Sequence, residues 1–263
     1  MNKNSPIGIF DSGVGGSSIW QEIHQLMPNE NTVYLADSKN APYGNKTQDE
    51  IVSLSIKNTE VLINMGCKII VVACNTATTN AIEILRSTFD IPIIGIEPAI
   101  KPAALQTKYK SIGILATKGT LSSALFHKTA KEFTKEVSVV EIIGEGLVPL
   151  IENDELETNE MKMLLKKYTA PMVAANIDYL VLGCSHYPYL IPQLHKILPT
   201  HVSIIDSGQA VAKQTQSVMQ QHGLLNESDK KGTLQFYTNT KVDTLKSLLK
   251  KYSEIITVEK MDF

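Results

Sequence analysis

The chain has 263 residues, of which 43% are hydrophobic, so it can bury a large core as one α/β domain or as two smaller ones. Its formal net charge of −2 excludes a broad electrostatic attraction to nucleic acid or to an anionic membrane. The longest apolar runs are strand-sized, and residues 1–10 lack the apolar core and cleavage site of a signal peptide, so we expect a cytoplasmic protein.

Short apolar runs alternate with helix-length segments along the chain, which predicts an α/β fold with mainly parallel sheets. The predicted strands are Ile7–Phe10, Thr32–Asp37, Lys68–Ala73, Ile91–Ile96, Ser111–Ala116, Ser138–Ile143, Tyr179–Gly183, Val202–Asp206 and Thr233–Thr238. The predicted helices are Ser17–Met27, Gln48–Met65, Thr78–Phe89, Thr120–Lys135, Glu155–Asn176, Pro192–Leu198 and Gln209–Gln221.

Two internal similarities suggest that the chain contains two related halves. The stretch Gly8–Ser18 resembles Gly113–Ser123 at an offset of 105 residues (113 − 8), and the surroundings of Cys74 resemble those of Cys184 at an offset of 110 (184 − 74). Proline-containing residues 97–102 and residues 206–210 are candidate crossings between the halves. We therefore predict one domain from residues 1–97 and 208–263, a second from residues 98–207, and a cleft between them.

The three cysteines, Cys67, Cys74 and Cys184, fit neither a zinc ribbon nor a disulfide framework and are expected to be free thiols. Cys67 has the setting of a core residue. Cys74 and Cys184 each follow a predicted strand, at the edge where parallel sheets bind ligands. A helix start there should lower the pKa of the thiol and favour the thiolate.

Polar residues at the same predicted strand ends could complete a site for a small carboxylate. The neutral donors there are Ser12, Asn75, Thr76, Thr117, Thr120 and Ser185. Asp11 could orient a thiol or a substrate ammonium, and His186 could assist proton transfer. Glu152 is a further acidic candidate for the catalytic set, although its setting in the sequence is ambiguous.

Three other uses of these residues match parts of the sequence. The glycines after Asp11, with Asp37 on the next strand, could form a dinucleotide loop, but Ser18 stands where that motif needs Gly or Ala. Cys74, Cys184 and His186 could hold zinc, although a metal-free use of them is favoured. Cys184 could also act as a nucleophile with His186 as its base, which leaves Cys74 without a role.

Seven motifs in order along the chain resemble the cofactor-independent glutamate racemases of bacterial cell-wall synthesis, within the aspartate and glutamate racemase superfamily. They are FDSGVGG (10–16), APYG (41–44), ACNTA (73–77), IEP (96–98), VPLIE (148–152), GCSHYP (183–188) and DSG (206–208). The resemblance implies two pseudosymmetric α/β domains with the site in the cleft between them, no cofactor, no metal and a homodimer. The sequence departs from the family pattern at Ser185, where a threonine is usual. The short segment before Ile7 leads us to expect no obligate activator.

The resemblance also implies roles for individual residues. Cys74 would deprotonate D-glutamate with Asp11 nearby, and Cys184 would deprotonate L-glutamate with His186 nearby. Substrate would contact Asp11, Ser12, Tyr43, Gly44, Asn75, Thr76, Ser185 and His186. Two thiols on opposite faces of one carbon suit an inversion by proton transfer, since a single base reaches both faces poorly. The product would be D-glutamate for peptidoglycan.

Other functions remain open at this level. A racemase of aspartate or of another amino acid would use the same chemistry. A decarboxylase or isomerase would need only one cysteine. A small-ligand sensor or a protein-binding module would use the same cleft without catalysis.

Overall fold

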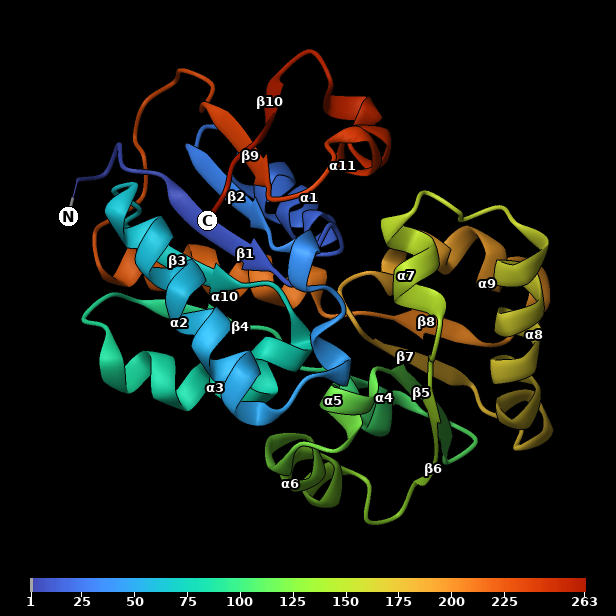
Figure 1. The fold of residues 1–263 in the computed structure, drawn as a ribbon. Helices are drawn as coiled ribbons and strands as arrows, with labels where there is room; N and C mark the ends of the chain where they lie inside the picture. The colour runs from blue at the N-terminus through green and yellow to red at the C-terminus, as the bar shows by residue number, and fades with distance from the viewer. Residues whose placement is uncertain (1) are drawn as a thin grey trace.

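The computed structural model describes residues 2–263 and contains two parallel sheets in two lobes (Figure 1). The first sheet has the order β10-β9-β2-β1-β3-β4, with β1 Ile7–Asp11, β2 Thr32–Ala36, β3 Ile69–Val72, β4 Ile93–Gly95, β9 Leu234–Thr238 and β10 Ile256–Lys260. The second has the order β6-β5-β7-β8, with β5 Ser111–Ala116, β6 Ser138–Ile143, β7 Tyr179–Gly183 and β8 Ser203–Ile205. The predicted α/β class with mainly parallel sheets is confirmed.

The two sheets repeat one topology. In the first, β1 lies between β2 and β3, with β4 beyond β3; in the second, β5 lies between β6 and β7, with β8 beyond β7. Strands β3 and β7 are therefore equivalent, and Cys74 and Cys184 follow their carboxyl ends. The internal similarity in the sequence corresponds to this repeat.

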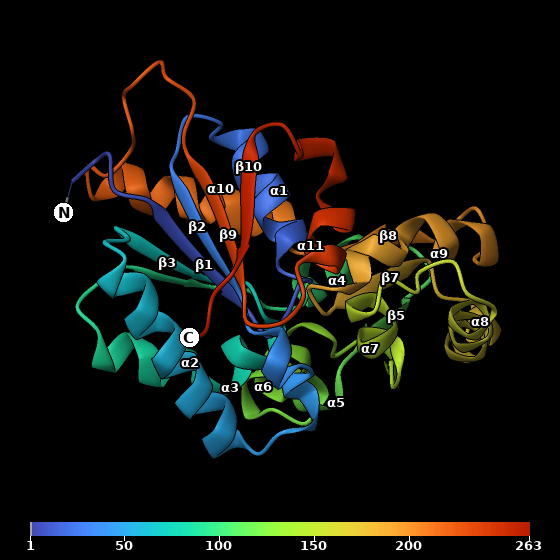
Figure 2. The ribbon, with the colours of Figure 1, turned by 45° about the horizontal axis from the view of Figure 1, so that its top comes forward.

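Helices cover both faces of the first sheet (Figure 2). Helices α1 (Ser17–Leu26) and α10 (Gly208–Gln221) pack on one face, and α2 (Gln48–Asn64) and α3 (Asn75–Thr88) on the other. Successive strand residues point to opposite faces, so Val71 joins the core under α1 and α10 while Val72 joins the core under α2 and α3. Burial on both faces explains the nearly continuous apolar runs of these strands.

The second sheet is covered in the same way. Helices α4 (Ile100–Gln106) and α6 (Ala124–Phe133) share a core with one face. Helices α7 (Leu147–Glu152), α8 (Asn159–Ala174) and α9 (Ile191–Ile197) share a core with the other. The remaining segments are α5 (Lys118–Leu121), α11 (Asp243–Leu248) and the 3-10 turns Ser38–Asn40, Tyr43–Asn45, Tyr187–Leu190 and Lys250–Tyr252.

Several predicted elements differ from the observed ones. Helix α3 starts three residues earlier than predicted, because Cys74 caps it, and the predicted helix Thr120–Lys135 is split into α5 and α6, because Ser123 caps α6 through the N–H of Phe126 at 3.2 Å. Strand β10 and helices α4, α7 and α11 were not predicted.

The chain crosses between the lobes twice, and the crossings are linked where the hydroxyl of Ser207 donates to the carbonyl of Glu97. The first and the last of the described residues both lie on the first lobe (Figure 1). Within residues 2–263, no helix has the length and apolar character needed to cross a membrane.

Candidate active site

The thiols of Cys74 and Cys184 line one small cavity, although they belong to different sheets. The cavity wall also includes other residues that the sequence singles out: Ser12, Tyr43, Gly44, Asn75, Thr76, Thr117, Ser185 and His186. Pro42 and Val148, which we did not predict, complete the wall. Asp11, Thr120 and Glu152 do not line the cavity, but each bonds a residue that does.

Cys74 lies at the N-cap of α3 and is only 4% exposed. Its sulfur accepts the main-chain N–H of Ala77 at 3.4 Å, and its thiol donates to the hydroxyl of Ser12 at 3.5 Å. Burial, with the nearby charge of Asp11, raises the pKa of Cys74 and outweighs these two contacts. The expected net lowering of the pKa by the helix start is therefore wrong for Cys74, because removal of the thiol from water is the larger effect.

Cys184 has a different neighbour. It follows β7 and precedes a turn rather than an α-helix, and its sulfur lies 3.8 Å from Nδ1 of His186. The imidazole is 1% exposed. Burial alone would lower the pKa of His186, but its contacts with Cys184, Glu152 and Asp11 raise that pKa well above the usual value. The raised pKa therefore places a hydrogen-bonding, positively charged imidazole beside the sulfur of Cys184.

Glu152 ties the imidazole to the opposite lobe. Its Oε1 lies 2.5 Å from Nε2 of His186 and accepts the main-chain N–H of Val14 at 2.7 Å, while its Oε2 accepts the hydroxyl of Ser38 at 2.8 Å. Val14 and Ser38 belong to the first lobe, and Glu152 ends α7 in the second. From the sequence alone, Glu152 is an ambiguous candidate for the site. In the structure it holds His186 in position and joins the two lobes.

The glycines of FDSGVGG make room for these side chains. A Cβ at Gly13 would lie 1.9 Å from a carboxylate oxygen of Glu152, and one at Gly15 would lie 2.2 Å from Nδ1 of His186. Both distances are far below any real contact, so glycine is required for the close approach of the second lobe. The space directly beside Gly13 and Gly15 is therefore occupied by Glu152 and His186.

Asp11 ends β1 and is fully buried. It accepts the hydroxyl of Ser185 at 2.9 Å and the N–H of Gly13 at 3.0 Å, and it lies 4.0 Å from Nδ1 of His186. Burial raises the pKa of Asp11, against the opposing effects of His186 and Ser185. The hydroxyl of Ser185, retained where the family usually has threonine, therefore has a defined partner.

Asn75 is the clearest candidate for a ligand contact. It is 2% exposed and lines the cavity, yet both its side-chain nitrogen and its side-chain oxygen lack a hydrogen-bond partner. An unpaired buried amide costs roughly 1–3 kcal/mol, which a bound carboxylate or ammonium would offset.

Three threonine hydroxyls form a closed network across the lobes. Thr76 contacts Thr117 at 2.8 Å and Thr120 at 3.3 Å, and Thr117 contacts Thr120 at 3.0 Å. Thr120 is fully buried behind the other two, so it acts on the cavity through them.

The cavity is nearly closed. It has a volume of about 10 Å³, which is close to what one water molecule needs. A second cavity of about 330 Å³ adjoins it and shares Pro42, Gly44, Thr117 and Val148 with its wall. An amino acid is larger than this volume, so the cavity must enlarge before a substrate can lie between the thiols.

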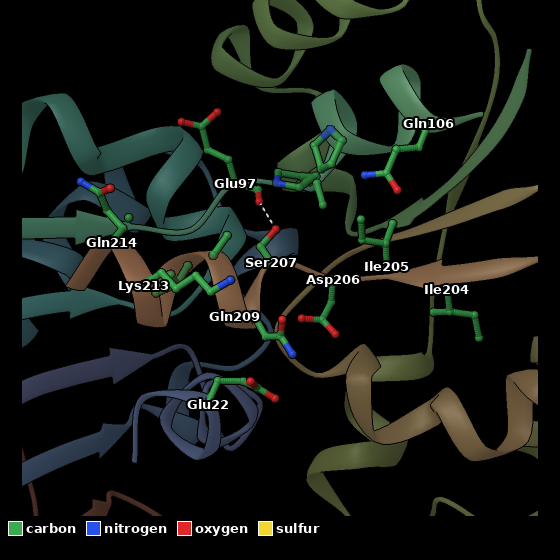
Figure 3. A pocket seen from close by; sticks show the side chains of 16 residues that line it. Glu22, Glu97, Gln106, Ile204, Ile205, Asp206, Ser207, Gln209, Lys213 and Gln214 are labelled. Carbon is green, nitrogen blue, oxygen red and sulfur yellow. Dashed lines mark hydrogen bonds between the residues drawn. The ribbon is translucent and has the colours of Figure 1, made fainter. Parts of the chain in front are cut away.

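Among residues 2–263, no cluster of three or more His, Cys, Asp or Glu side chains is arranged to hold a metal ion, so Cys74, Cys184 and His186 do not form one. All three cysteines in this part of the chain are free. The largest cavity described, about 860 Å³, lies beside the lobe crossings near Glu97 and Ser207 and contains neither active-site thiol (Figure 3).

Comparisons with known proteins identify the family of the chain. Residues 13–215 match the Asp/Glu/Hydantoin racemase family. A glutamate racemase of Herpetosiphon aurantiacus is 41% identical over 237 residues, which cover 90% of this chain and 93% of that protein. Glutamate racemase RacE1 from Bacillus anthracis superposes with a TM-score of 0.87 at 31% identity, over 100% of this chain and 99% of the other.

A third similar protein was solved with ligands bound. The Escherichia coli glutamate racemase, solved in complex with L-glutamate and the activator UDP-MurNAc-ala, has a TM-score of 0.85 and 31% identity, over 98% of each chain. The fold and site define an α/β isomerase of the amino-acid racemase class. The chain belongs to the Asp/Glu/Hydantoin racemase family, and its predicted resemblance to glutamate racemases is confirmed.

Proposed function

We propose that this chain interconverts L- and D-glutamate by proton transfer between Cys74, Cys184 and the Cα of the substrate. The single observation that carries the proposal is that two thiols from equivalent strands of two related sheets line the same cavity. The glutamate specificity is taken from relatives that share most of their length with this chain.

Each turnover would move two protons. With D-glutamate bound, the thiolate of Cys74 takes the Cα proton, so an S–H bond forms as the C–H bond breaks and the electron pair passes to the substrate carbanion. The thiol of Cys184 then gives its proton to the opposite face of Cα and becomes the thiolate. L-glutamate would react in the reverse sense. One thiol and one thiolate alternate, because two adjacent thiolates would repel each other.

The surrounding groups would support this cycle. Protonated His186, held by Glu152, would stabilise the thiolate of Cys184. Asn75, with its unpaired amide, and the hydroxyls of Ser12, Thr76 and Ser185 would hold the substrate carboxylates. Exclusion of water from the closed cavity would strengthen each of these interactions.

Further parts of the proposal concern the setting of the enzyme. The sheets suggest one domain from residues 1–97 and 208–263 and a second from residues 98–207. The D-glutamate formed would serve peptidoglycan synthesis in the cytoplasm, where thiols remain reduced. The enzyme would act as a homodimer without a cofactor.

The purified protein tests the proposal directly. We expect each enantiomer of glutamate to approach a mixture of equal parts, as measured by chiral chromatography, while D- and L-aspartate react far more slowly. A kcat/KM for aspartate that is higher than the kcat/KM for glutamate would make aspartate the substrate instead. Conversion of neither amino acid would contradict the proposed function.

A further inference from the structure

The carboxylate of Asp37 is buried in the first lobe and has no place in the proton-transfer scheme. It follows β2 beside Asp11, whose carbonyl accepts its N–H at 3.0 Å, and it is 1% exposed. A buried carboxylate is costly unless hydrogen bonds compensate for the loss of water, so its partners indicate what it does.

Every hydrogen bond found for this carboxylate comes from a neutral side chain. One oxygen accepts Asn239 at 2.6 Å and Asn40 at 2.8 Å; the other accepts the hydroxyl of Tyr43 at 2.5 Å and Asn58 at 3.5 Å. Asn58 also donates to the oxygen of Tyr43 at 3.1 Å. The phenol of Tyr43 is thus held at its tip by two buried groups.

This anchor lies behind a wall of the active-site cavity. Residues 42–44 line the cavity between the thiols, and Pro42 and Gly44 also line the adjoining outer cavity. Tyr43 is 1% exposed, and its hydroxyl is directed to Asp37. The position of these three residues therefore depends on the bond between Tyr43 and Asp37.

We propose that Asp37 is a positioning residue for substrate binding: through the hydroxyl of Tyr43 it fixes residues 42–44 as the wall against which the amino acid is bound. Its effect on KM rests on the proposed glutamate racemase function. Its effect on the order of residues 38–45 does not, and this difference lets one experiment test both ideas separately.

The experiment compares the intact protein with Asp37→Asn, Tyr43→Phe and the double variant. Asp178→Asn is the matched control, because Asp178 is also a buried carboxylate that holds a loop, through Thr107, Lys108 and Tyr109 of the second lobe. Two quantities are measured: amide hydrogen exchange over residues 38–45, and KM and kcat for both enantiomers of glutamate.

Asp37→Asn and Tyr43→Phe should each speed exchange over residues 38–45 and raise KM about tenfold, with kcat changed less than about threefold. The double variant should be no worse than Asp37→Asn, since each change removes the charge-assisted bond between the carboxylate and the hydroxyl of Tyr43. Asp178→Asn should alter exchange only near residues 107–109 and leave KM unchanged. If Asp37→Asn does not fold, Tyr43→Phe, which removes one oxygen, carries the test.

The proposal is overturned if exchange over residues 38–45 stays at the wild-type rate, if the two single effects multiply in the double variant, or if KM stays constant while kcat falls. A wild-type protein that does not racemise glutamate would contradict the proposed function instead. The exchange measurement would then still decide whether Asp37 orders this wall.

Discussion

Oε1 of Glu152 lies 2.5 Å from Nε2 of His186, and the same oxygen accepts the main-chain N–H of Val14 from the opposite lobe. The two side chains form a buried pair whose position depends on contact between the lobes. A contact from the opposite lobe thus holds the carboxylate of Glu152 where it favours the imidazolium of His186.

Glu152→Gln tests this effect. Removal of the negative charge should lower the pKa of His186, because the carboxylate of Glu152 favours the imidazolium. If protonated His186 supports catalysis, the basic limb of the kcat/KM profile should move to lower pH. An unchanged profile in Glu152→Gln would show that Glu152 does not control this proton.

The stability of the protein should also report the pKa of His186. The folded-state pKa is raised above the unfolded value, so below about pH 6.5 the imidazole is protonated in both states and the stabilisation is fully present. As pH rises toward the raised pKa, only the folded state keeps the proton, and the stabilisation is progressively lost.

Urea unfolding at several pH values above 6.5, compared between the wild type and His186→Gln, measures this effect. The free energy of unfolding of the wild type should fall more steeply with pH, by up to about 1.4 kcal/mol per pH unit. His195→Gln, on an exposed residue of α9, is the control and should follow the wild type. Parallel curves for the wild type and His186→Gln would contradict the raised pKa.

Gly15→Ala should displace the imidazole ring of His186. The new Cβ would lie 2.2 Å from Nδ1 of a buried ring, so the ring or the turn must move. Misplacement by about 1 Å can cost roughly a hundredfold in rate, and we expect a loss of that order in kcat/KM with the far-ultraviolet circular dichroism retained. Wild-type activity in Gly15→Ala would show that the close approach is not needed.

The cysteines should fall into two functional classes. Cys74→Ser and Cys184→Ser should each reduce the rate of racemisation at least about a thousandfold. The reason is that a serine hydroxyl is a far weaker acid than a thiol, so it neither donates a proton to Cα nor ionises to a base as a cysteine does. Cys67→Ser is the control: Cys67 packs against Gly8 in the core, and burial raises its pKa to about 12. That variant should lose stability but keep its activity. Full activity in Cys74→Ser would exclude the use of two bases.

Local sequence features predicted the elements that local physics determines. The buried strands β3 and β7 are read from apolar runs, and the positions of Cys74 and Cys184 follow from them. Strand β10 was missed because it is a mostly exposed edge strand with charged Glu259 and Lys260, and α7 because it has only six residues and contains Pro149.

Contacts between residues far apart in the sequence could not be predicted from local sequence features. The bond from Val14 to Glu152 spans 138 residues, and that from Asn239 to Asp37 spans 202. Neither follows from periodicity or capping, because each depends on how separate elements pack. The glycines Gly13 and Gly15 were visible in the sequence, but their purpose requires knowing which side chains approach them.

The central claim is that two thiols act on opposite faces of one Cα, and deuterium incorporation tests it most directly. Each enantiomer of glutamate is incubated in heavy water, and product and remaining substrate are analysed at early times by mass spectrometry after chiral separation. The account predicts that the product carries deuterium at Cα from the first turnover while the remaining substrate keeps its protium. Product that retains the original proton, as transfer by one shared base would give, would contradict it.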